Sequence, residues 1–112
     1  MEDNKEHKFE AGEICSMEYG INMNLVRFYE VTRVSKSNVW FERIDESFEH
    51  DGYGQEGWKL PLPSSSRRSQ EFRLKIYMSV DKKNNTNQYA HMKHRGIIKK
   101  WNGKPIYYNC MD

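Results

Sequence analysis

Residues 72–80 read FRLKIYMSV, and this stretch decides the fold class. Two sets of side chains alternate along it: Phe72, Leu74, Ile76, Met78 and Val80 share one face, and Arg73, Lys75, Tyr77 and Ser79 share the other. Strict alternation is typical of a β-strand with one buried and one solvated face. We therefore expect Phe72, Leu74, Ile76 and Met78 to be buried together.

Two further apolar runs on either side of a polar turn predict a β-hairpin over residues 26–44. Residues 25–34 and 39–44 are rich in Val, Phe and Tyr, and Ser35-Lys36-Ser37-Asn38 lies between them. Such a pattern favours two antiparallel strands joined by a tight turn. An earlier strand is expected over residues 13–19, entered through Gly12.

The end of the chain carries a second hairpin signal, Asn102-Gly103, between the apolar runs 96–101 and 104–109. A type I′ turn needs positive φ at both central residues, which Asn-Gly tolerates. We expect those two runs to pair. Residues 89–95 fit either a helical turn or an irregular strand.

The segments between these runs are predicted from composition. Residues 45–57 form an acidic, glycine-containing stretch that predicts a loop, and residues 64–70 and 81–88 predict polar loops. Residues 58–63 predict a short extended piece, in which Pro61 and Pro63 exclude a central strand position. Five to seven short strands then indicate a mainly β fold, either a small single-domain β-barrel or a strongly bent antiparallel sheet, with or without one short helix.

Composition agrees with this fold class and sets the domain organisation. The 112 residues include 15 aromatic ones and only two alanines, so strand formers outweigh helix formers. We expect a flexible N-terminal tail over residues 1–8 and one β-rich domain over residues 9–112. No apolar run is long enough for a membrane span or a signal peptide, which predicts a cytoplasmic protein.

Two cysteines, Cys15 and Cys110, are expected to be free thiols in a reducing compartment, although a disulfide would be possible between neighbouring first and last strands.

Charge is uneven along the chain. Residues 1–56 carry 13 acidic and 6 basic side chains, net −7, whereas residues 57–112 carry 3 acidic and 12 basic ones, net +9. Either the basic half meets an anionic partner, or the two halves interleave and neutralise each other.

Three signals for chemistry are weak. Residues 52–57 match G-x-G-x-x-G, but they follow acidic residues and precede Trp-Lys-Leu-Pro rather than a helix, so a phosphate site is not expected. His91 and His94 are spaced for a metal, but a zinc site usually needs a second tight ligand pair. No Ser, Cys or Thr stands in a nucleophile motif. The sequence predicts no enzyme activity, no metal and no cofactor, and an enzyme with an unrecognised site remains the third alternative.

The strongest functional signal is a set of basic residues interleaved with aromatic ones in the second half. Cations of this kind bind phosphates, and aromatic rings stack on unpaired bases. The candidate residues for a nucleic acid or a partner are Arg67, Arg68, Arg73, Lys75, Lys82, Lys83, Lys93, Arg95, Lys99, Lys100, Trp101 and Lys104. The alternative is that the rings form the core and the lysines keep the domain soluble.

The acidic stretch offers a second candidate surface. Its carboxylates, Asp45, Glu46, Glu49, Asp51 and Glu56, do not follow the spacing of a calcium loop. They predict a solvated acidic loop or a contact surface for a basic partner protein.

Four short motifs resemble a group of small phage- and plasmid-encoded proteins. They are Phe9-Glu10-Ala11-Gly12-Glu13-Ile14, Tyr19-Gly20, Phe28-Tyr29-Glu30-Val31 and Trp101-Asn102-Gly103-Lys104-Pro105. The group's pattern runs F-x-x-G-[DE]-I, Y-G, F-Y-x-V and W-[DN]-G-K-P, and residues 45–71 do not match it. The resemblance implies an origin in a mobile genetic element and carries over no functional residue.

Two functions follow as hypotheses. The first is a non-catalytic phage-type accessory protein that binds and inhibits a host nucleic-acid-processing complex, such as a defence nuclease, with the acidic stretch as a nucleic-acid mimic. The second is a β-barrel module that binds nucleic acid directly through its basic half. The expected partner is a host protein or nucleoprotein complex in the first case and nucleic acid in the second, with no membrane in either.

Overall fold

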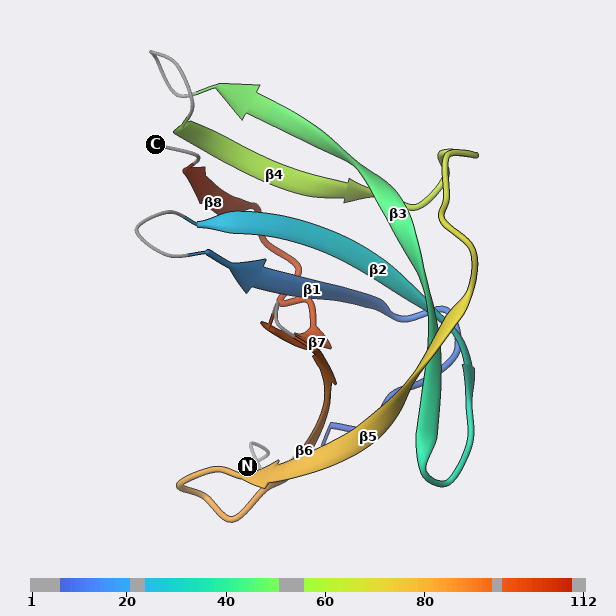
Figure 1. The fold of residues 1–112 in the computed structure, drawn as a ribbon. Helices are drawn as coiled ribbons and strands as arrows, with labels where there is room; N and C mark the ends of the chain where they lie inside the picture. The colour runs from blue at the N-terminus through green and yellow to red at the C-terminus, as the bar shows by residue number, and fades with distance from the viewer. Residues whose placement is uncertain (1–6, 21–23, 51–55, 94–95, 110–112) are drawn as a thin grey trace.

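The chain folds into one antiparallel sheet of eight strands in the computed structural model, which describes residues 7–20, 24–50, 56–93 and 96–109 (Figure 1). The strands are β1 (Ile14–Tyr19), β2 (Leu25–Val34), β3 (Asn38–His50), β4 (Glu56–Leu62), β5 (Phe72–Val80), β6 (Thr86–Met92), β7 (Gly96–Lys100) and β8 (Ile106–Asn109). The described residues contain no helix, and so none that could cross a membrane. The predicted β class is therefore confirmed, and residues 89–92 belong to a strand.

The sheet partly closes into a ring. The strand order is β2-β1-β7-β6-β5-β3-β4-β8, and an additional β2–β3 pairing joins six of these strands into a closed circuit. β3 makes this possible because its first residues pair with β5 and its last residues pair with β4 along the same edge. β4 and β8 extend from the ring, and β8 returns to the start of β2 through the backbone of Asn24 and Asn109.

The hairpin predicted over residues 26–44 is confirmed as β2 and β3. Their register runs from Phe28 opposite Ile44 to Val34 opposite Val39, with a bulge between Val31 and Arg33. The Ser35 backbone N–H donates to the Asn38 carbonyl oxygen at 2.8 Å and closes the turn.

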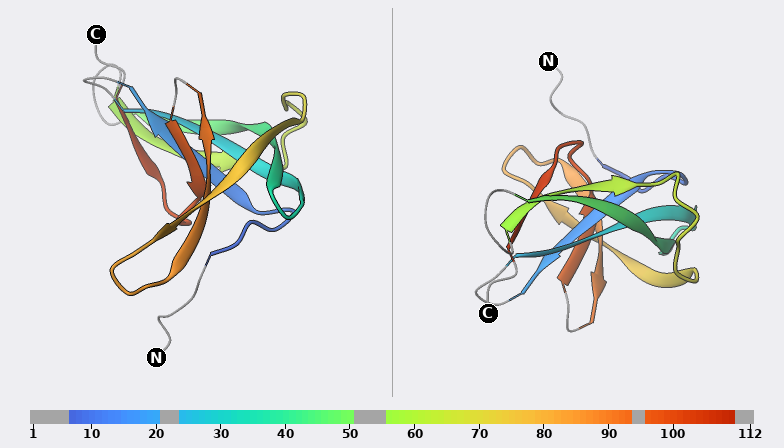
Figure 2. Two further views of the ribbon diagram at one scale, coloured as in Figure 1. Left: turned by 60° about the horizontal axis from the view of Figure 1, so that its bottom comes forward. Right: turned by 90° about the horizontal axis from the view of Figure 1, so that it is seen from above.

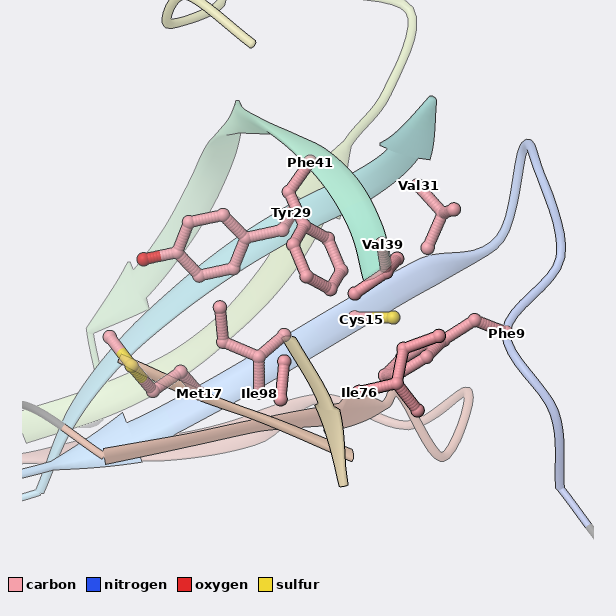
Figure 3. Packing of buried hydrophobic residues seen from close by; sticks show 10 residues of the cluster. Phe9, Cys15, Met17, Tyr29, Val31, Val39, Phe41, Ile76 and Ile98 are labelled. Carbon is pink, nitrogen blue, oxygen red and sulfur yellow. The ribbon is translucent and has the colours of Figure 1, made fainter. Parts of the chain in front are cut away.

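Two hydrophobic clusters lie on opposite faces of β2. The ring core fills the six-stranded circuit (Figure 3) and consists of Phe9, Cys15, Met17, Tyr29, Val31, Val39, Phe41, Ile76, Ala90 and Ile98. The side core lies under β4 and β8 and consists of Val26, Phe28, Ile44 and Ile106. Because successive side chains of a strand point to opposite faces, β2 supplies both cores from alternate positions.

The Cys15 thiol lies in the ring core and is a free cysteine. Its burial raises its pKa far above the usual range, so the thiol stays neutral and unreactive. Cys110 lies outside the described residues. The predicted tail also lies outside them up to residue 6, whereas His7 forms a parallel bridge to Asn87 of β6.

The strand predicted over residues 72–80 is confirmed as β5, but its burial differs at one end. Ile76 is buried, and Phe72 and Leu74 pack against the ring core. The prediction was wrong for Met78, which is 63% exposed, and Val80 on the same face is 65% exposed. β3 ends its pairing with β5 at Lys75, so the far half of β5 continues with β6 as a two-stranded arm that projects from the ring (Figure 2). No second layer covers that face of the arm within the described residues.

The loop predicted over residues 45–57 was also wrong. Residues 45–50 continue β3 and pair with β4 from Asp45 opposite Leu62 to His50 opposite Gly57. β4 lies between β3 and β8 only over residues 57–59, so Pro61 sits where one edge of β4 has no partner, as a strand proline requires. The loop predicted over residues 81–88 is shorter, because β6 begins at Thr86.

The predicted pairing of residues 96–101 with residues 104–109 was wrong. β7 pairs with β1 and β6, whereas β8 pairs with β4. Gly103 has a positive φ of 83°, but Asn102 does not, so the turn is not type I′. The Asn102 Oδ1 instead accepts the backbone N–H of Lys104 at 2.9 Å and turns the chain from the ring toward the side core.

Replacement of Ile76 and of Val80 by alanine tests how β5 is buried. We expect Ile76→Ala to lower the free energy of unfolding by about 2–5 kcal/mol, because it removes buried methyl groups from the ring core. Val80→Ala should change it by less than about 0.5 kcal/mol, since that side chain is exposed. Urea unfolding followed by fluorescence measures both, and equal losses would contradict the described burial.

Gly57→Ala tests the close approach of β4 to β3. A Cβ on Gly57 would overlap the backbone oxygen of Glu49 and lie 2.7 Å from the Phe48 Cε1 atom. The strands must move apart to admit it, which costs about 1–3 kcal/mol. Gly96→Ala is the matched control, because its Cβ would meet no atom nearer than 3.4 Å. Thermal unfolding of the two variants should show a clear drop in Tm only for Gly57→Ala; similar melting points would refute the close approach.

Candidate nucleic-acid interface

The outer face of the ring carries a stacked pair of tyrosines, of which Tyr77 is exposed and Tyr89 is partly exposed. Ring-core residues fix the inward positions of β5 and β6, so the alternate positions point outward. Tyr77 of β5 lies directly opposite Tyr89 of β6, and their rings stack with centroids 5.7 Å apart and planes 23° apart. Tyr77 is 42% exposed. The pair therefore presents aromatic surface to solvent.

Cations flank the tyrosine pair on both sides. The Lys75 Nζ atom lies 5.5 Å from the centroid of the Tyr77 ring. On the other side, Lys99 of β7 and Tyr89 line the same open groove, whose volume is about 840 Å³. His91 and the 47%-exposed Ile97, which lie directly opposite each other on β6 and β7, also line this groove.

The same outward face continues across β3 to β2. Trp40 lies opposite Arg73 of β5 and opposite Arg33 of β2. The Arg33 Cζ atom stands 4.1 Å from the Trp40 ring centroid, within the range of a cation–π contact. We use the name cationic belt for the residues that cross these five strands: Arg33, Trp40, Arg73, Lys75, Tyr77, Tyr89 and Lys99.

Little negative charge opposes the belt. Arg33 Nη2 lies 3.8 Å from Glu71 Oε1, and both side chains are exposed to solvent. Arg73, Lys75 and Lys99 form no ion pair with any other residue in the described ranges. Glu18 is the acidic residue that lines the groove. The belt can therefore attract an anion, since its charges are largely uncompensated.

Two of the predicted basic residues lie elsewhere, on the segment between β4 and β5. Arg68 forms ion pairs with Glu30 Oε1 at 2.6 Å and with Glu42 Oε1 at 3.0 Å. Hydrogen bonds to Glu42 and Glu30 raise the pKa of Arg68. Its side chain thus ties this segment across β2 and β3, while Arg67 beside it is exposed.

The remaining predicted cations are scattered around the arm and the strand ends. Lys82 and Lys83 are exposed on the loop between β5 and β6, Lys93 follows β6, and Lys100 ends β7. Lys104 is exposed on the connection between β7 and β8, and Arg95 lies outside the described residues. Of the predicted basic set, the structure brings together Arg73, Lys75 and Lys99.

The predicted stacking residue, Trp101, belongs to the fold. Its ring packs edge-on against Phe28 of the side core, with centroids 6.1 Å apart and planes 83° apart. Its Nε1–H donates to the carbonyl oxygen of Lys104 at 2.7 Å. Both interactions hold the chain where it leaves β7, so Trp101 stabilises this connection and is not a member of the belt.

The predicted acidic surface is partly neutralised. Glu46 forms an ion pair with Lys59 of β4, and both side chains are largely buried. Asp45 accepts the backbone N–H of Glu46 at 2.9 Å and the Ser65 hydroxyl at 3.3 Å. Glu49 is exposed, whereas Asp51 and the side chain of Glu56 lie outside what the structure describes.

The weaker signals contribute no residue to the belt, and one of their histidines lies beside it. Gly57, the last glycine of the G-x-G-x-x-G stretch, is buried in β4, and residues 52–55 lie outside the described ranges. His91 lines the groove, and His94 is not described. Among the described residues, no group of three metal-ligating side chains lies together.

Sequence reasoning missed Arg33, Trp40 and Tyr89. Alternation within the hairpin contained one signal, because Val39 and Phe41 point inward and leave Trp40 outward. No pattern in the sequence indicated that Tyr89 pairs with Tyr77, because this pairing depends on where β6 starts.

The belt combines two kinds of chemistry across adjacent strands. Its lysines and arginines can neutralise phosphates, and its outward-facing rings can stack on bases. Both properties come from side chains that the ring core forces outward. No protein-family model, curated protein or solved structure matches this chain.

Proposed function

We propose that the protein binds single-stranded nucleic acid on the cationic belt. The observation that carries the proposal is the outward-facing Tyr77–Tyr89 stack with Lys75 on one side and Lys99 on the other. Base–aromatic stacking contributes about 1–3 kcal/mol per base, and each neutralised phosphate releases counterions. An alternation of cations and rings matches the alternation of phosphates and bases along a strand.

Single strands fit the belt better than duplexes. The tyrosine rings lie on a sheet face, where an unpaired base can stack on them but a base inside a duplex cannot reach them. The belt also follows the curved outside of the ring, and the described part of the chain has no helix that could enter a major groove. Duplex binding would therefore use the cations alone.

The alternative hypothesis, a phage-type inhibitor with an acidic mimic, has less support. A mimic needs exposed carboxylates, but Glu46 is paired with Lys59 and Asp45 is hydrogen-bonded to Ser65. Glu49 retains an exposed charge on β3. A host nucleoprotein complex remains a compatible target, because the belt can bind its nucleic acid.

Salt titration tests the electrostatic part of the proposal. We expect the affinity for fluorescein-labelled dT20, measured by anisotropy, to fall steeply with salt. Lys99→Ala should weaken binding and flatten the slope of log K against log salt by about 0.7, the value for one phosphate contact to a single strand. Arg67→Ala removes one exposed charge outside the belt and is the matched control. An equal effect of both variants would contradict a localised site.

Tyr77→Ala tests the stacking part. Loss of one stacked base should weaken dT20 binding by about 5- to 150-fold and leave the weaker binding of a 20-base-pair duplex nearly unchanged. The half-exposed Tyr77 side chain points away from the ring core and contributes little to it. The melting temperature should therefore stay close to that of the parent protein. Equal losses for the single strand and the duplex, or no binding of dT20 by the parent protein, would reject the proposal.

A further inference from the structure

The outer edge of β5 is unpaired over the second half of the strand. The β3–β5 ladder ends at Lys75, after which the Ile76 N–H donates to the Ser37 carbonyl oxygen at 2.9 Å. Beyond that bond, no strand of the described residues lies along this edge. Backbone groups of successive strand residues point to alternate sides. The N–H and C=O groups of Met78 and Val80 therefore point the same way as those of Ile76, into open space.

The side chains at this edge are apolar and exposed. Met78 and Val80 are the most exposed large hydrophobic residues that the structure describes, at 63% and 65%. Natural sheets usually blunt such an edge with a proline or a bulge. Here the pairing of β5 with β6 is regular from Ile76 to Val80, and the stretch contains no proline. This edge is therefore ready to accept another strand.

The opposite edge of the same arm, along β6, is paired with another segment of the chain. The His7 N–H donates to the Thr86 carbonyl oxygen at 3.2 Å, and the Gln88 N–H donates to the His7 carbonyl oxygen at 3.0 Å. The chain's own N-terminal segment thus pairs with β6. The arm consequently has one edge that the protein covers itself and one that it leaves open.

The charges around the open edge indicate which kind of strand can bind there. Residues 75–83 carry the cations Lys75, Lys82 and Lys83 around this edge and one acidic residue, Asp81. The Asp81 carboxylate already accepts the backbone N–H groups of Asn85 at 2.9 Å and Lys83 at 2.8 Å, which lowers its pKa. The edge is therefore cationic as well as apolar.

A second copy of the chain fits this edge poorly. Two copies paired antiparallel along this edge would bring Lys75 of one copy near the turn that carries Lys82 and Lys83 of the other. Like charges brought together in this way destabilise a strand pair. An acidic strand would have attraction at the same positions.

We infer that the open edge of β5 binds an extended segment of a partner protein in which acidic and apolar residues alternate. The segment would add a strand through the backbone of Met78 and Val80. Its apolar side chains would cover Met78 and Val80, and its carboxylates would face Lys75, Lys82 and Lys83. This surface shares only Lys75 with the belt and needs no nucleic acid.

A defined peptide tests the inference. The probe is a fluorescein-labelled heptapeptide of alternating glutamate and valine. We expect it to bind and to slow amide exchange at Met78 and Val80 by about tenfold or more. The same peptide with lysine for glutamate, or with every backbone nitrogen methylated, should not bind. Binding of either control would overturn the charge argument or the strand-addition argument.

Variants place the peptide on the edge. Val80→Asp should weaken its binding by about tenfold or more, because it introduces a like charge and removes an apolar contact. Ile97→Asp, at an exposed apolar position on β7, is the matched control, and melting curves check the folding of both. Equal effects of the two variants, or new amide protection only on the belt, would overturn the inference. So would a sedimenting dimer of the free protein with Met78 and Val80 already protected, which would make a second copy the occupant.

Discussion

The pairing of β2 with β3 is the interaction on which the rest of the structure depends. β2 supplies Tyr29 and Val31 to the ring core and Val26 and Phe28 to the side core. β3 continues past β2 and offers one edge first to β5 and then to β4. Full burial of each large apolar side chain contributes about 1.5–3 kcal/mol, so loss of this pairing would expose both cores together.

The belt is a consequence of that closure. Once the ring core fixes which residues of β5, β6 and β7 point inward, the remaining positions must point outward. The belt residues then lie on neighbouring strands, although most of the chain separates the first of them, Arg33, from the last, Lys99. The same closure explains the projecting arm, because β5 is longer than the part of β3 that pairs with it.

Local pattern was enough to predict the hairpin and the β class. Apolar alternation and a polar turn define β2, β3 and β5 without any knowledge of their partners. Alternation in residues 72–80 also identified the correct face, but it could not show that nothing covers Met78 and Val80. Burial depends on a second layer, which periodicity within one strand does not report.

The remaining errors have a similar origin in pairing between distant segments. Residues 45–50 have the composition of a loop and become a strand because β4 pairs with them and Lys59 neutralises Glu46. Asn102-Gly103 makes a local turn, yet its flanking strands find other partners. Basic residues were recognised by type, but only the three-dimensional structure separates Lys75 and Lys99, which belong to the belt, from Arg68, which forms ion pairs with Glu30 and Glu42.

The central claim is that the outward positions of β5, β6 and β7 form one binding surface. Amide chemical shifts of the ¹⁵N-labelled protein during titration with dT20 test this most directly, because they report on every strand at once. The account predicts shifts that saturate together at Tyr77, Tyr89 and Lys99, with Arg68 and Trp101 unmoved. Shifts centred on β4 and the segment that follows it, or no shifts at all, would contradict it.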